Sequence, residues 1–164
     1  MKWRLGVLLW MCLLAFSGCK TKTVVQKKFW YQITLPKKWK VLSPTSLQSP
    51  DPDPTRLTIV RRRDSGSLES YAKAQIESLQ IEIPDFQQED QQYFKIQGRR
   101  AWKLVGVFRP KGPNTPRVVR IKVYVASRDY KYDLTILLPA EAYRSRRKGL
   151  DKILKTFRFT IPEY

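Results

Sequence analysis

The stretch RIKVYVASRDYKYDLTILLP, residues 120–139, contains two runs in which apolar and polar side chains alternate. A period of two is typical of a β-strand that buries one face. Arg128 and Asp129 between the runs leave room for only a tight turn, so we predict an antiparallel β-hairpin. The apolar face of its first strand comprises Val119, Ile121, Val123 and Val125, and that of its second comprises Tyr130, Tyr132, Leu134, Ile136 and Leu138.

Further strands are expected on the N-terminal side of this hairpin. Phe29–Trp39 is rich in aromatic and β-branched residues and is stopped by Pro36, and Arg56–Arg63 alternates. Gln92–Gln97 and Ala101–Phe108 are expected to form two strands joined at Gly98-Arg99. The segments 43–55 and 109–116 contain several prolines each and are predicted to be loops.

Two segments change from the period of a strand to the period of a helix. Residues 68–80 place Leu68, Tyr71, Ala72, Ile76 and Leu79 on one face, and Ser67 can cap the first turn. Residues 140–155 carry the second apolar stripe, and the segment FRFTI after it is expected to be extended. We therefore predict an α+β fold, with a central and mostly antiparallel sheet flanked by two main helices.

The composition excludes several classes of chemistry. The chain of 164 residues has no histidine and two cysteines, Cys12 and Cys19. Without histidine there is no Ser-His or Cys-His pair, and no metal site built on histidine. The formal net charge is +18, which favours anionic partners such as acidic headgroups, acidic envelope polymers or nucleic acid, although the sequence shows no nucleic-acid motif.

The N-terminal segment has the parts of a secretory signal. Lys2 and Arg4 precede a run of 14 residues without charge, which is shorter than the roughly 20 apolar residues of a membrane-spanning helix. Ser17-Gly18-Cys19 ends the run and resembles the lipobox of bacterial lipoproteins. The resemblance implies cleavage before Cys19 and a diacylglycerol on its sulfur. An ordinary signal peptide with an incidental cysteine is the alternative.

Cleavage after residue 18 would leave a chain with net charge +16 and Cys19 as its only cysteine, with no disulfide. Residues 19–28 are expected to be a basic tether, and residues 29–164 to be the folded domain. Two acyl chains suffice for stable anchoring. Lys20 stands where an Asp often signals retention in the inner membrane, so an extracytoplasmic lipoprotein in the outer membrane, if the cell has one, is the expected location.

The order of the motifs ITLPKKW, SLESYAKAQIESLQ, IQGRRAWKLVG and LKTFRF around the hairpin is similar to that of the PsbP/DcrB-like family. The resemblance covers about residues 29–160 and implies an antiparallel sheet with helices on both faces. Many members are extracytoplasmic, and the bacterial ones are often lipoproteins. These motifs are structural and carry no catalytic signature, so the resemblance implies no enzyme and no cofactor.

Basic residues are the polar feature that stands out. We predict that a membrane-proximal set and a distal patch contact an anionic surface, either acidic lipid headgroups or an acidic envelope protein; solvation of a surface charged for solubility is the alternative. The predicted contacts are Lys20, Lys22, Lys27, Lys28, Arg144, Arg146, Arg147 and Lys148.

The expected function is that of a non-catalytic, lipid-anchored binding or assembly module of the cell envelope. One alternative is a carrier of a small apolar ligand between sheet and helix, with Trp30, Trp39 and Trp102 around it. A hydrolase is less favoured, because Ser70 and Lys73 lie three apart, as in S-x-x-K, without the other motifs of that enzyme class. Asp51 and Asp53 lack the rest of an EF-hand and are expected to belong to a rigid loop rather than to a metal site.

Overall fold

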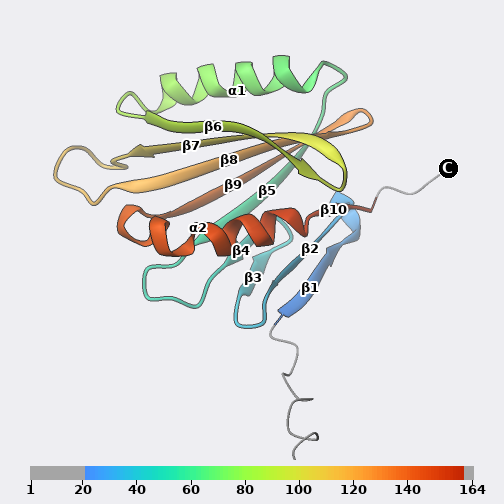
Figure 1. Ribbon diagram of the computed structural model, residues 1–164, viewed down its shortest axis with the longest axis horizontal. Helices are drawn as coiled ribbons and strands as arrows, with labels where there is room; N and C mark the ends of the chain where they lie inside the picture. Colours follow the sequence, from blue (N-terminus) through green and yellow to red (C-terminus); the bar gives the residue numbers. More distant parts are fainter. Residues whose placement is uncertain (1–20, 161–164) are drawn as a thin grey trace, which may run out of the picture.

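The computed structural model describes residues 21–160 and contains two helices, one short 3-10 helix and ten strands (Figure 1). The helices are α1 (Leu68–Glu82) and α2 (Ala140–Lys155), and the 3-10 turn is η1 (Lys27–Phe29). The strands are β1 (Thr21–Gln26), β2 (Tyr31–Pro36), β3 (Lys40–Ser43), β4 (Ser46–Gln48), β5 (Arg56–Arg63), β6 (Gln87–Ile96), β7 (Arg99–Phe108), β8 (Val118–Ser127), β9 (Tyr130–Pro139) and β10 (Arg158–Phe159).

The central sheet has seven strands in the order β3-β4-β5-β9-β8-β7-β6, and every pair in it is antiparallel. The predicted hairpin is confirmed: β8 and β9 pair from Val118↔Pro139 to Ser127↔Tyr130. Arg128 in its turn has φ 52°, and the turn between β6 and β7 also uses positive φ, at Gln97 (50°) and Gly98 (74°). Such backbone matches the twist of tight hairpins.

A second, three-stranded sheet in the order β1-β2-β10 joins the two ends of the described chain. β1 pairs with β2 along its whole length, from Thr21↔Pro36 to Gln26↔Tyr31. The prediction of a tether through residue 28 is therefore wrong, because the fold begins by Thr21. Alternation explains the strand: Lys22, Val24 and Gln26 are half-buried while the residues between them are exposed.

The molecule has three layers, with α1 on one face of the central sheet and α2 with the small sheet on the other (Figure 1). The predicted α+β fold with helices on both faces is thus confirmed. The face toward α2 is closed by a continuous apolar core, to which the hairpin contributes the predicted positions Val119 to Val125 and Tyr132 to Leu138. Helix α2 contributes Leu150, Ile153 and Leu154 to this core, and the segment that follows α2 contributes Phe157.

The face toward α1 is more polar. Its small apolar cluster centres on Tyr71, Ala72 and Tyr124. Beside this cluster, the Lys122 Nζ lies 2.6 Å from the Asp133 Oδ2, and both side chains are nearly buried. Burial lowers the pKa of Lys122, and the Asp133 carboxylate partly opposes that shift.

Both predicted helices are confirmed, and Ser67 caps α1 by accepting a hydrogen bond from the Ser70 amide. The predicted loop 43–55 is wrong in part, because it contains β4. The buried Leu47 holds this short strand between β3 and β5, and the prolines lie outside it. β6 also begins five residues earlier than predicted, because its first half is a polar edge strand without apolar alternation.

Candidate functional site

The predicted lipid site, Cys19, and its neighbour Lys20 lie outside the described residues. The structure begins beside them, at Thr21, where β1 starts against the end of β2. The β2–β3 turn brings three exposed lysines to this end of the molecule: Lys37, Lys38 and Lys40. We call this end, with Lys22 and the three turn lysines, the anchor-end surface.

Lys22 is held in this surface, because its ammonium donates a hydrogen bond to the carbonyl oxygen of Trp39. Trp39 is buried in the core and donates its backbone amide to the Pro36 carbonyl at 3.0 Å. The turn that presents the lysines is thereby fixed to β1 on one side and to the core on the other. The charges of the anchor-end surface consequently have a defined position relative to the first described residue.

Exposed apolar side chains accompany these charges. Val41 is 44% and Leu42 is 54% exposed, and both lie on β3, the edge strand that follows the turn. Lysines together with accessible aliphatic groups are the composition of surfaces that bind a membrane interface, where the aliphatic groups enter the headgroup boundary and the lysines meet anionic lipids.

Lys27 and Lys28, which the sequence grouped with Lys22, lie at the opposite end of β1 in η1. A six-residue strand spans about 20 Å, so Lys22 and the two lysines of η1 lie near opposite ends of β1. Residues that are near in sequence are here separated by the length of an extended segment, so Lys27 and Lys28 are not part of the anchor-end surface.

The distal patch on α2 divides into engaged and free residues. Arg146 is engaged, since its guanidinium contacts the Asp51 carboxylate at 3.2 Å and donates to the Asp53 carbonyl at 3.1 Å and the Thr55 hydroxyl at 3.0 Å. Arg147 lies 3.5 Å from the Asp90 carboxylate. These contacts give both arginines a structural role: Arg146 fixes the proline-rich loop, and Arg147 links α2 to β6.

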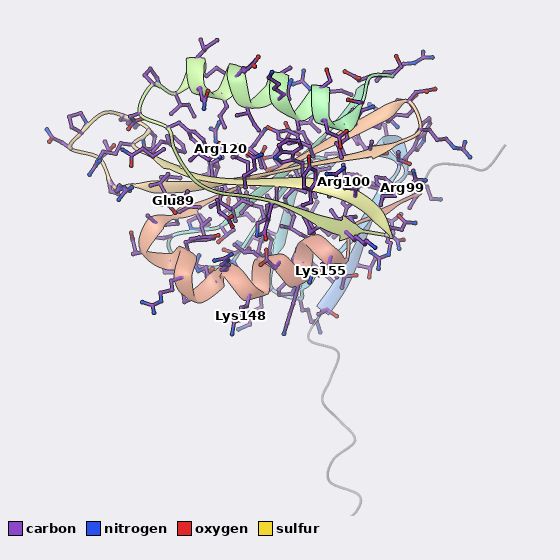
Figure 2. The ribbon with its side chains drawn as sticks, turned by 45° about the horizontal axis from the view of Figure 1, so that its top comes forward. Glu89, Arg99, Arg100, Arg120, Lys148 and Lys155 are labelled. Atoms are coloured by element: carbon purple, nitrogen blue, oxygen red, sulfur yellow. The ribbon has the colours of Figure 1, made fainter. Side chains whose placement is uncertain are left out.

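Arg144 and Lys148 are exposed, and neither has an ion-pair partner within residues 21–160. Two further exposed lysines, which were not among the predicted contacts, continue this row along the helix. We call Arg144, Lys148, Lys152 and Lys155 the α2 ridge. Helical spacing was the available signal, because steps of four, four and three residues keep side chains on one face. Figure 2 shows Lys148 and Lys155 on the side of the molecule where β1 begins.

The other candidates from the sequence do not assemble into one site. Trp39 is in the core, Trp102 contacts Tyr93 with ring centroids 4.8 Å apart, and Trp30 contacts Tyr130 at 5.2 Å. The three tryptophans therefore do not surround a common cavity. Ser70 and Lys73 both line an open pocket of about 490 Å³ between α1 and β6, but no hydrogen bond joins their side chains.

Metal and membrane-spanning features are likewise missing from the part of the chain that is described. Among residues 21–160, no group of three or more acidic or cysteine side chains could hold a metal ion. Over the same residues, no helix has the length and apolar character needed to cross a membrane.

Comparisons with known proteins define the fold. Neither a family model nor a curated protein sequence matches the chain. Among solved structures, the cyanobacterial PsbP protein of Synechocystis aligns with a TM-score of 0.62 over 88% of this chain and 95% of its own, at 12% identity. The fold is PsbP-like.

Two bacterial proteins share this fold with similar coverage. Protein PA94 of Pseudomonas aeruginosa, of unknown function, aligns with a TM-score of 0.61 at 14% identity, over 89% of this chain and 99% of its own. LpqN of Mycobacterium tuberculosis, a protein involved in cell envelope biogenesis, aligns with a TM-score of 0.55 at 14% identity, over 88% of each chain. At such identities the likeness establishes the architecture, and function has to be argued from this chain's own surface.

Proposed function

We propose that the protein is a non-catalytic binding module of the cell envelope, attached by a lipid on Cys19 and docked on anionic lipid headgroups through its anchor-end surface. The observation that carries the proposal is the start of β1 at Thr21, two residues after Cys19, directly beside the turn that presents Lys37, Lys38 and Lys40.

The short spacing decides how the domain would sit. Two residues reach at most about 7 Å, so a lipid on Cys19 would hold the anchor-end surface within a Debye length of the headgroups. Each Lys or Arg near an anionic surface contributes about 1 kcal/mol. The four lysines of the anchor-end surface would therefore orient a domain that the acyl chains already hold at the membrane.

Several observations support a binding role over catalysis. The chain has no histidine, and no hydrogen bond joins the side chains of Ser70 and Lys73, the pair that the sequence offered for catalysis, at their open pocket. The PsbP-like fold occurs in LpqN, whose role is in envelope biogenesis, which is compatible with an extracytoplasmic location for this chain. Lys20, in place of an aspartate, favours the outer membrane in a cell that has one.

The test uses a soluble form, residues 20–164, which retains every described helix and strand. Its binding to vesicles of phosphatidylcholine with phosphatidylglycerol is measured by co-sedimentation at low and high salt. We expect binding to the acidic vesicles that salt releases, and none to phosphatidylcholine alone.

Reversing the charges of the turn, in Lys37→Glu, Lys38→Glu and Lys40→Glu together, is expected to weaken binding at least about 100-fold. The matched control reverses Lys27, Lys28 and Arg63, three exposed cations of which the two lysines lie at the other end of β1, and is expected to have a much smaller effect. Equal losses in the two triple variants, or no binding to acidic vesicles at low salt, would refute docking through this surface and leave an acidic protein as the partner to seek.

The α2 ridge provides a second, graded comparison. Arg144→Glu, Lys148→Glu and Lys152→Glu together are expected to have an effect between those of the two other triple variants, because the ridge lies on the side where β1 begins, whereas the turn lysines are fixed directly to β1 through the Lys22–Trp39 hydrogen bond. Arg146 is left unchanged, since its loss would free the loop of residues 49–55.

A further inference from the structure

An open pocket lies on the α1 face of the central sheet, beyond the C-terminal end of α1. It has a volume of about 390 Å³ and is independent of the anchor-end surface. Its floor is a row of paired residues on neighbouring strands, Arg56↔Leu137↔Arg120. Its lining consists of Asp53, Pro54, Arg56, Phe108, Pro110, Val118, Arg120, Leu137, Leu138 and Pro139.

The packing of Phe86 explains where the pocket begins. Phe86 follows α1 and lies over Gly106, the residue beside Arg120 in the same row. A Cβ at Gly106 would meet the Phe86 ring at 2.1 Å, so only glycine allows this contact. The ring covers the sheet up to β7, and the floor on β8, β9 and β5 remains accessible between the loops that carry Pro54 and Pro110.

The pocket combines this apolar lining with two arginines that have no acidic partner. Within residues 21–160, neither Arg56 nor Arg120 has a carboxylate oxygen within 4.0 Å. The Arg120 guanidinium lies over the Phe108 ring at 5.0 Å, and its Nε is buried without a hydrogen-bond acceptor. Figure 2 shows Arg120 between α1 and the sheet.

An unpaired guanidinium donor in a partly dry site favours an anionic acceptor from outside the chain. Burial lowers the pKa of Arg120, and the Glu82 and Asp133 carboxylates oppose that shift, so the guanidinium stays charged. Guanidinium groups match a carboxylate by two parallel hydrogen bonds. Pockets of this volume that are mostly apolar, with a few polar groups, are typical of sites for small molecules.

We propose that this pocket binds a small amphipathic anion: an apolar body, packed on Phe108, Val118 and Leu137, that carries one carboxylate toward Arg56 and Arg120. The inference goes beyond membrane docking, because the site lies on the sheet face toward α1, whereas docking uses the end where β1 begins.

Octanoate is the probe, with 1-octanol as its neutral counterpart, titrated into the soluble form and followed by backbone amide chemical shifts. Octanoate is expected to shift the amides of Val118, Arg120 and Leu137, and 1-octanol to bind at least about tenfold more weakly. Shifts of equal size with both probes, or no shift of these amides at millimolar octanoate, would overturn the proposal. An acidic peptide that shifts them where octanoate does not would also overturn it.

Matched variants separate the charge from the fold. Arg56→Gln with Arg120→Gln is expected to weaken octanoate binding at least about tenfold, while Arg63→Gln with Arg128→Gln, exposed arginines away from the pocket, leaves it unchanged. Asp53→Asn removes the one carboxylate in the lining and is expected to strengthen binding. Weakening by Asp53→Asn, or equal effects of the two arginine pairs, would contradict an anion site. Each variant's thermal unfolding is recorded so that a lost fold is recognised.

Discussion

The two faces of the central sheet are built differently. The face toward α2 is mainly an extensive apolar core shared with the small sheet, with the Lys103–Asp151 ion pair beside it, whereas the face toward α1 has a small apolar cluster, the nearly buried Lys122–Asp133 pair and two open pockets. Each strand supplies both faces, because successive side chains point in opposite directions. The difference indicates that most of the apolar burial, and with it most of the hydrophobic stabilisation, lies on the α2 face.

The comparison is sharpest at two neighbouring residues of β9. Leu134 lies in the core, and Leu134→Ala is expected to lower the free energy of unfolding by about 2–5 kcal/mol through the cavity it leaves. Thr135, on the other face, accepts a hydrogen bond from the Lys122 ammonium at 2.9 Å, and Thr135→Ala should cost only about 1 kcal/mol. Urea unfolding of both variants provides the measurement, and similar losses would break the comparison.

The ion pair on the α1 face is expected to add specificity rather than stability. Lys122→Met leaves the Asp133 carboxylate without its cation and should cost about 2–3 kcal/mol, below the range for fully buried pairs because Lys122 is partly accessible. The double variant Lys122→Met with Asp133→Leu should recover most of that loss. A double variant less stable than the single one, measured by urea unfolding, would show that the pair is a net stabilising feature.

Phe86 packs over Gly106 of β7, and the part of the α1 face that is covered ends at this contact. Gly106→Ala is expected to cost about 1–3 kcal/mol, because the ring would have to move from the sheet. Phe86→Leu in the Gly106→Ala background should restore part of the loss, since a smaller side chain leaves room for the methyl group. Thermal unfolding of the three variants tests this, and an unaffected Gly106→Ala protein would contradict the close approach.

High pH should destabilise the protein, because burial raises the pKa of tyrosines on both faces of the sheet, among them Tyr124 on the α1 face. Burial raises the pKa of Tyr31 and of Tyr132 to about 12, and both phenols donate hydrogen bonds to backbone carbonyls, Tyr31 to Pro44 and Tyr132 to Phe29 and Trp30. Since the unfolded chain releases these protons near pH 10, the stability they contribute is complete below pH 10 and is lost as the pH rises toward 12.

The check is the free energy of unfolding measured by urea between pH 9 and 12. The decline with pH should become less steep in Tyr31→Phe and in Tyr132→Phe than in the unchanged protein. A decline that neither substitution alters would assign alkaline unfolding to other groups.

The sequence predicted the parts of the fold that depend on local periodicity. The hairpin of residues 118–139, both helices and the cap at Ser67 follow from alternation, helical spacing and one side-chain acceptor. It did not predict β1, β4 or the first half of β6, which are short or polar and are strands because a neighbouring strand offers them backbone partners. Pairing between distant segments is a tertiary effect that periodicity does not report.

The sequence predicted that the candidate surface is basic, but it did not predict which basic residues belong to it. The excess of basic residues was evident from composition, yet Lys27 and Lys28 are separated from Lys22 by a strand, and Arg146 and Arg147 are engaged with Asp51 and Asp90. The turn lysines at 37, 38 and 40 join the surface only because β2 runs antiparallel to β1. Which charges share a surface depends on strand register, which the sequence alone left open.

The proposed function depends on a lipid on Cys19 that holds this domain at the membrane. The most direct measurement is metabolic labelling of cells with a fatty-acid analogue, comparing the unchanged protein with Cys19→Ser and recovering each from membrane and soluble fractions. We expect the unchanged protein to be labelled and to pellet with membranes, and Cys19→Ser to be unlabelled. Equal labelling of the two proteins, or no labelling of either, would contradict it.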